Sequence, residues 1–171
     1  GSVREFDGPV SGAELAADIG PSLAKAALAV KVDGEVRDLS RTIDTDAGVE
    51  IVTRDHEDAL SLLRHDAAHV FAEAVQELYP GTQITFGPAI EDGFYYDFYR
   101  DEPFTPDDFE AMEKRMQEIV DRDEEITREV WDRGAAIAHF RDAGESFKVE
   151  HIKTIRADEE ISIYRQGNWL D

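Results

Sequence analysis

One run of about 20 residues, from just after Asp58 to Leu78, constrains the fold most. Its apolar side chains recur at spacings of three and four, which is the period of an amphipathic α-helix. They are Leu60, Leu63, Ala67, Phe71, Ala74, Val75 and Leu78. Tyr79-Pro80-Gly81 then interrupts the pattern. We therefore predict a long helix that buries this stripe and ends at Leu78.

Two histidines lie on an adjacent stripe of the same predicted helix. His65 and His69 are four residues apart, so their imidazoles project from one side of the helix. Such a pair can bind a transition metal, contact a ribose or phosphate, or orient a catalytic water. The polar flank of a solvated helix explains the pair equally well. Their place beside the apolar stripe is typical of a helix that lines a cleft.

The residues before this helix predict a small unit of strands and helices over residues 3–56. Val3–Phe6 alternates as a short strand. Ser11 and Glu14 have the spacing of a capping box, so a helix begins there and ends at Gly20-Pro21. A second, shorter helix is expected over residues 21–27.

Strand patterns complete this unit. Residues 29–32 and 35–39 flank Asp33-Gly34, the dipeptide that most strongly indicates a hairpin turn. A last strand is expected over residues 49–53. This order suggests a β-grasp, ubiquitin-like unit, with an N-terminal strand of that fold missing from the chain. We place the domain boundaries at 1–56 and 57–171.

The second domain is expected to combine helices with an antiparallel sheet, so the fold class is α+β. Strands are predicted over residues 84–90, 93–99, 126–131 and 161–165. Thr105 and Pro106 open a helix, since threonine caps well and proline suits the first helical position. Asp132 caps another over residues 135–141. The helix that begins at Thr105 and Pro106 is expected to bury the apolar residues Phe109, Met112, Met116, Ile119 and Val120.

Composition excludes some classes of function. The 171 residues include 42% hydrophobic residues, enough for packed cores, but no run of the ~18 apolar residues that a membrane span needs. The chain has no cysteine, which favours a reducing, cytoplasmic setting. Its net charge of −21, from 18 basic and 39 acidic residues, argues against non-specific binding to nucleic acids or membranes.

The order of the motifs resembles the N-terminal half of bacterial threonyl-tRNA synthetases. After the ubiquitin-like unit come Arg64-His65-x-x-x-His69, Gly87-Pro88, Gly93-Phe94-Tyr95-Tyr96-Asp97 and Gly144-Glu145-Ser146-Phe147-Lys148. The resemblance covers essentially residues 3–171. It implies a TGS domain followed by an editing domain, which is shared in outline with alanyl-tRNA synthetases and free-standing editing proteins.

The resemblance also implies which residues form the editing pocket. His65, His69, Lys148 and Asp171 are the expected catalytic residues, and Tyr96, Gly87 and Pro88 are expected to bind the substrate. The family's later Cys-x-x-x-His pair is expected just beyond Asp171, outside this chain. The aminoacylation core and the anticodon-binding domain are also expected outside it, so we do not expect this chain to charge tRNA.

The implied reaction is hydrolysis of serine that has been mischarged onto threonine tRNA. Editing is needed because one methyl group distinguishes these amino acids by only ~1–3 kcal/mol. By this resemblance a histidine activates or positions water, Lys148 polarises a carbonyl, and Asp171 orients a ligand or water.

Cofactors and partners follow from the same resemblance. The pocket is expected to be metal-free and this chain to need no cofactor, while the full synthetase uses ATP, Mg²⁺ and Zn²⁺. The expected partners are the 3′ end and acceptor arm of threonine tRNA and the rest of the synthetase chain, with no membrane. We expect a homodimer for the full protein and a monomer for this chain.

Two other classes remain open on the sequence. A non-catalytic TGS-containing interaction module agrees with the acidic charge, but it gives no reason for the Asp-Gly-Phe-Tyr-Tyr-Asp and Glu-Ser-Phe-Lys motifs. A free-standing editing protein agrees with those motifs, but it normally lacks the unit over residues 11–53.

Overall fold

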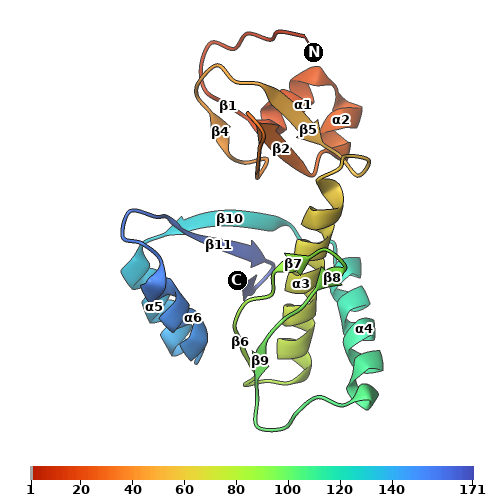
Figure 1. Cartoon of the computed structure of the whole chain (residues 1–171), viewed down its shortest axis with the longest axis vertical. Coiled ribbons are helices and arrows are strands. Elements are labelled where there is room, and N and C mark those ends of the chain that lie inside the picture. Colours follow the sequence, from red (N-terminus) through yellow and green to blue (C-terminus); the bar gives the residue numbers. More distant parts are fainter. Residues whose placement is uncertain (1) are drawn as a thin grey trace. The chain divides into compact units, whose positions relative to one another are not determined.

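The computed structural model describes residues 2–171 and contains two compact units, one up to Leu63 and one from Arg64 to Asp171. Both units combine helices with small antiparallel sheets (Figure 1), which confirms the α+β class. The division falls within helix α3 (Ala59–Leu78), several residues after the expected domain boundary. Ala59 and Leu62, in the first turn of α3, pack in a hydrophobic cluster of the first unit.

The first unit contains the two predicted helices. Helix α1 (Gly12–Ile19) starts with the expected capping box, in which the Ser11 amide donates to Glu14 Oε2 (2.8 Å) and the Glu14 amide donates to Ser11 Oγ (3.2 Å). Helix α2 (Pro21–Ala26) follows directly, with proline in its first turn.

Three antiparallel strands form the main sheet of this unit, in the order β3-β2-β5. They are β2 (Ala29–Val32), β3 (Glu35–Arg37) and β5 (Val49–Val52). Asp33 and Gly34 join β2 to β3 with positive φ angles of 48° and 89°, the conformation that an Asp-Gly turn supplies. Val30 and Val32, from the centre of the sheet, are buried with Ile43.

The predicted strand over Val3–Phe6 is wrong. These residues are exposed and make no sheet pairing, so an alternating pattern there has no core to face. A short ladder that the sequence did not reveal joins β1 (Val10–Ser11) to β4 (Thr42–Ile43) instead, with Val10 opposite Ile43.

The second unit is built on the rest of α3 and an interrupted hairpin. The two predicted strands exist, but they pair only at their ends. Strand β6 (Gln83–Ile84) pairs with β9 (Phe98–Tyr99), and β7 (Ala89–Ile90) pairs with β8 (Gly93–Phe94). Phe71 of α3 packs against Phe94 and Phe98, with ring centroids 6.0 and 5.3 Å apart. The unpaired stretch between the ladders contains Gly87, Pro88 and Tyr96.

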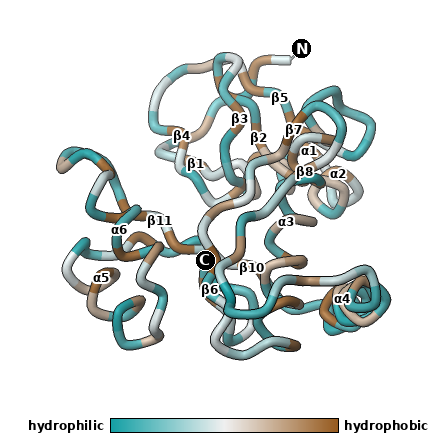
Figure 2. Tube along the Cα trace, turned by 60° about the horizontal axis from the view of Figure 1, so that its bottom comes forward, coloured by the Kyte–Doolittle hydropathy of each residue, from teal (hydrophilic) through white to brown (hydrophobic). Residues whose placement is uncertain are grey.

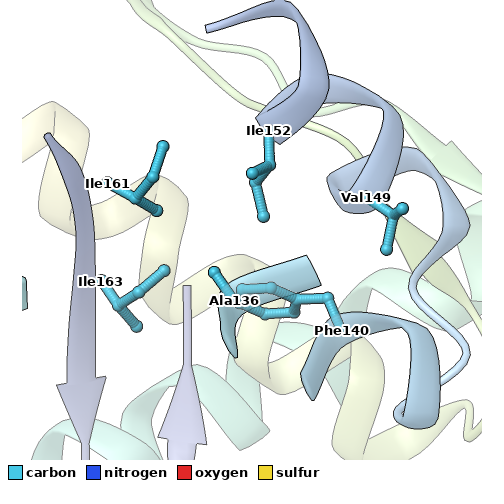
Figure 3. Close-up of a cluster of buried hydrophobic side chains, with 6 residues drawn as sticks. All are labelled: Ala136, Phe140, Val149, Ile152, Ile161 and Ile163. Carbon is cyan, nitrogen blue, oxygen red and sulfur yellow. The ribbon is translucent and has the colours of Figure 1, made fainter. Parts of the chain in front are cut away.

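A sheet of three strands, β10 (Ile126–Trp131), β11 (Ile161–Gln166) and β12 (Trp169–Leu170), carries the rest of the unit. Two helices cover it: α5 (Arg133–Asp142), capped by Asp132 as predicted, and α6 (Ser146–Thr154), which the sequence did not predict. The core between them is shown in Figure 3. It contains Ala136, Phe140, Val149, Ile152, Ile161 and Ile163.

Helix α4 (Pro106–Asp121) begins at Pro106 with Thr105 as its cap, as expected, and it carries both hydrophilic and hydrophobic residues (Figure 2). Its predicted buried stripe is too wide. Met112 and Ile119 are buried, but Phe109 and Val120 are more than half exposed. The prediction of the buried face of α3 fails in the same way. Leu60 and Leu63 were expected to be buried but are exposed, whereas Ala68 and Ala72 are buried. A helix that packs along one narrow line buries only part of an amphipathic face.

Within residues 2–171, no helix is both long enough and apolar enough to cross a membrane.

Candidate functional site

A cavity of about 400 Å³ opens in the second unit. All seven residues predicted for the site line it. They are His65, His69, Gly87, Pro88, Tyr96, Lys148 and Asp171. They come from α3, the interrupted hairpin, α6 and the segment after β12. The site is therefore assembled from four separate segments of the sequence.

Helix α3 presents the two imidazoles side by side. Nε2 of His65 lies 3.0 Å from Nε2 of His69, and the rings meet edge to face with centroids 4.5 Å apart. This contact follows from the spacing of four residues on one helix. Since both atoms are Nε2, one ring donates and the other accepts in this hydrogen bond.

A tight hairpin brings Asp171 to these histidines. Strands β11 and β12 pair through Gln166 and Trp169, and Gly167 between them has a φ of +56°. The chain then returns alongside β11, where the Asp171 and Tyr164 backbones exchange two hydrogen bonds of 2.7 and 2.9 Å. The C-terminal segment therefore lies beside α3 (Figure 1).

The Asp171 carboxylate is bound on both sides. Its Oδ2 lies 2.7 Å from Nδ1 of His69, and its Oδ1 lies 2.5 Å from Nζ of Lys148. Lys148 is only 8% exposed, and it also donates to the Leu170 carbonyl (3.2 Å). Burial opposes the ionisation of Asp171, but its contacts with His69 and Lys148 outweigh burial and hold its pKa well below the ordinary value. Asp171 is therefore an anion in the folded protein.

Tyr96 reaches the same carboxylate from the hairpin. Burial first, and then the negative charges of Asp171 and Glu145, raise the pKa of Tyr96 well above its ordinary value, so its hydroxyl stays protonated. The ring lies across the backbone of Gly87. A Cβ at position 87 would lie 2.1 Å from Tyr96 Cδ2 and 2.6 Å from the Tyr95 carbonyl oxygen. Only glycine therefore allows this approach.

The environment of His65 favours its neutral form. Burial and, to a smaller extent, the neighbouring His69 lower the pKa of His65. At neutral pH its imidazole is therefore available as a base.

The same residues do not fit a resident metal ion. Among residues 2–171, no group of three or more His, Cys, Asp or Glu side chains is arranged to hold one. The carboxylate nearest the histidines is already paired with the Lys148 ammonium, and the two Nε2 atoms bond to each other. The positive charge of the Lys148 ammonium opposes the binding of a divalent metal ion at the same carboxylate.

Sequence reasoning did not identify three polar or aromatic residues that support the site. Gln76, Glu145 and Trp169 form a chain of hydrogen bonds behind it. The sequence offered one indication of this role: Gln76 lies on the same stripe of the helix as His65 and His69. Nothing in the sequence near Glu145 or Trp169 shows that they meet Gln76.

The comparisons with known proteins agree with this architecture. The TGS domain family matches residues 1–53, which are thus the β-grasp unit expected from the sequence. The whole chain is 63% identical to threonine–tRNA ligases of Acidiphilium cryptum and Rhodospirillum rubrum, and 63% identical over 172 aligned residues to that of Thiobacillus denitrificans. The chain spans about a quarter of the length of these relatives, 27% in each case.

The fold and these matches define a TGS-domain protein of the aminoacyl-tRNA synthetase class. More narrowly, the chain corresponds over its whole length to the N-terminal region of threonyl-tRNA synthetases.

Proposed function

We propose that this chain is the part of a threonine–tRNA ligase that hydrolyses seryl esters wrongly attached to threonine tRNA. In this proposal the tRNA 3′ end enters the cavity of the second unit. The ATP- and Mg²⁺-dependent ligation of threonine belongs to the rest of the polypeptide. The ligase names of relatives that match all 171 residues support this assignment over a TGS interaction module or a free-standing editing protein.

The observation that carries the proposal is the continuous chain of contacts from Asp171 through His69 to His65. An anionic Asp171 favours a proton on Nδ1 of His69, because that atom faces the carboxylate. With the proton on Nδ1, Nε2 of His69 offers a lone pair that accepts a hydrogen bond from Nε2–H of His65. His65 is left with a lone pair on Nδ1. The chain thus selects one tautomer of each histidine.

Nδ1 of His65 is consequently the general base. It takes a proton from a water molecule as the water oxygen bonds to the ester carbonyl carbon. The bond from that carbon to the ribose oxygen then breaks, and the proton passes to the ribose oxygen as it leaves. Serine and the free tRNA are the products. A positive charge that develops on His65 is shared through His69 with the anionic Asp171, which stabilises the transition state.

We assign Lys148 a different role from the polarisation of a carbonyl that the sequence suggested. Its ammonium is occupied by Asp171 and the Leu170 carbonyl, so we assign it to keeping Asp171 ionised and in place. Tyr96, whose pKa is raised by burial and then by the Asp171 charge, faces the same carboxylate. Both residues therefore act through Asp171.

Replacement of the base tests the proposal. In the synthetase that carries this region, His65→Ala is expected to slow hydrolysis of seryl-tRNA by ~10²–10⁴-fold, the usual contribution of a general base. For the wild type, kcat/KM should rise with pH and become constant by neutral pH, because the pKa of His65 is lowered.

His139→Ala is the matched control, since His139 is an imidazole of the same unit that does not line the cavity. It should hydrolyse seryl-tRNA at the wild-type rate. Equal rates for His65→Ala and the wild type would exclude the proposed role.

A further inference from the structure

We propose that Trp169, held by Gln76, is a positioning residue that fixes His69 and Lys148 against Asp171. This inference rests on the function proposed above for its effect on catalysis, but not for its effect on the histidine. Trp169 precedes Asp171 by two residues, in strand β12.

The Trp169 indole contacts two of the side chains that bind Asp171. Its ring meets the His69 ring edge to face, with centroids 6.0 Å apart and planes at 74°. The Lys148 ammonium lies over the indole, 5.6 Å from its centroid, and also over the Phe140 ring, 5.0 Å from that centroid. One flat ring thus limits the movement of both groups that ion-pair with Asp171.

A hydrogen bond at the far edge of the indole fixes its orientation. Nε1 of Trp169 donates to Oε1 of Gln76 over 2.9 Å. An indole has a single donor, so this bond defines how the ring is rotated. Gln76 lies on α3 seven residues after His69, and it therefore anchors the indole to the helix that carries both imidazoles.

Gln76 is itself held at its other end. Its Nε2 donates to Glu145 Oε1 and to the Thr82 carbonyl (3.3 Å). Glu145 also accepts from the Ile84 amide (3.4 Å) and immediately precedes α6, the helix that carries Lys148. The Gln76 and Glu145 side chains together therefore tie α3 to β6, the start of α6 and β12. Of these elements, α3 carries both histidines, α6 carries Lys148, and β12 directly precedes Asp171.

The consequence for chemistry concerns the tautomer of His69. The Nδ1–H form is favoured only while Nδ1 faces Asp171. If the indole rotates, the imidazole is free to turn about its own side-chain bonds, and the contacts from Asp171 through His69 to His65 are lost. A displacement of about 1 Å in a group of this kind can cost ~10²-fold in rate.

Trp169→Phe tests the inference, because it keeps an aromatic ring but removes the donor to Gln76. The matched control is Trp131→Phe in the same unit. Trp131 also donates its indole N–H to a side chain, Glu129 (2.6 Å), and also packs edge to face on a histidine, His139. It does not line the cavity.

Two measurements separate positioning from simple structural support. Imidazole nitrogen NMR shifts of this 171-residue chain report the tautomer of each histidine without any substrate. We expect wild type and Trp131→Phe to show His69 in the single Nδ1–H form, and Trp169→Phe to show a mixture. In the synthetase, Trp169→Phe should lower kcat for seryl-tRNA about tenfold or more and change KM by less than about twofold. Trp131→Phe should leave both values as in the wild type.

Gln76→Met is a second variant that removes the acceptor and leaves the indole in place, so it should give the same mixture of tautomers. The inference is overturned if Trp169→Phe and Gln76→Met only lower the stability and leave the His69 tautomer as in the wild type. If the wild-type synthetase does not hydrolyse seryl-tRNA, the proposed function fails, yet the NMR comparison still decides whether Trp169 positions His69.

Discussion

Glu73→Gln is expected to change how the stability of the second unit depends on pH. Glu73 lies on α3 one turn after His69 and is 2% exposed. Its Oε2 is buried without a hydrogen-bond partner, and its Oε1 is 3.4 Å from Nη1 of Arg122. Arg122 binds Glu77 more closely, at 2.7 and 2.8 Å. Glu73 is therefore a buried carboxyl whose one cationic partner, Arg122, is bound more closely by Glu77.

Burial, followed by the negative charge of Glu77, raises the pKa of Glu73 from 4.5 to about 7, against the smaller opposing effect of Arg122. The folded state therefore binds this proton more tightly than the unfolded state. The resulting stabilisation is complete below about pH 4.5 and is lost as the pH rises through 7. The difference between the two pKa values corresponds to roughly 3 kcal/mol. Glutamine cannot titrate, so the variant lacks this dependence.

Urea unfolding between pH 5 and 9, followed by tryptophan fluorescence, measures the effect. Trp131 and Trp169 both belong to the second unit, so the signal reports that unit alone. The free energy of unfolding of Glu73→Gln minus that of the wild type should increase by about 2–3 kcal/mol from pH 5 to pH 9. The change with pH is the test, because the new amide also alters hydrogen bonding at every pH.

Glu113→Gln, at an exposed position of α4, is the control and should show a difference that does not vary with pH. If the Glu73→Gln difference is equally constant, then burial does not raise the pKa of Glu73 in the folded state, and the reasoning is wrong.

Two further predictions concern single residues of each unit. Ser11→Ala removes the side-chain acceptor of the Glu14 amide and should destabilise α1 by about 1 kcal/mol, measured by hydrogen exchange of α1 amides, whereas unchanged exchange would mean that the capping box contributes nothing. Gly87→Ala places a Cβ within 2.1 Å of the Tyr96 ring and should displace it from Asp171, lowering seryl-tRNA hydrolysis at least tenfold. A variant that stays fully active would show that Tyr96 need not lie where it does.

Local chemistry in the sequence determined most of the elements. The Ser11–Glu14 box, the Asp33-Gly34 turn and the Asp132 cap each act over three or four residues, so their outcome does not depend on the rest of the fold. The spacing of His65 and His69 likewise fixed their contact as soon as α3 formed. The motifs also pointed to seven residues that line one cavity, because the resemblance supplied what spacing alone did not.

Tertiary structure decided which side chains are buried and which meet. Leu60 and Phe109 satisfy the helical period yet are exposed, because a period shows that a face is apolar but not how much of it another element covers. The bond between Gln76 and Trp169 joins residues 93 positions apart, and no local rule specifies such a pair. The same holds for Lys148, which becomes a buried partner of Asp171 only once α6 and the β11–β12 hairpin have packed. The sequence thus determined the residues of the candidate site, and the fold determined the contacts and charges that surround them.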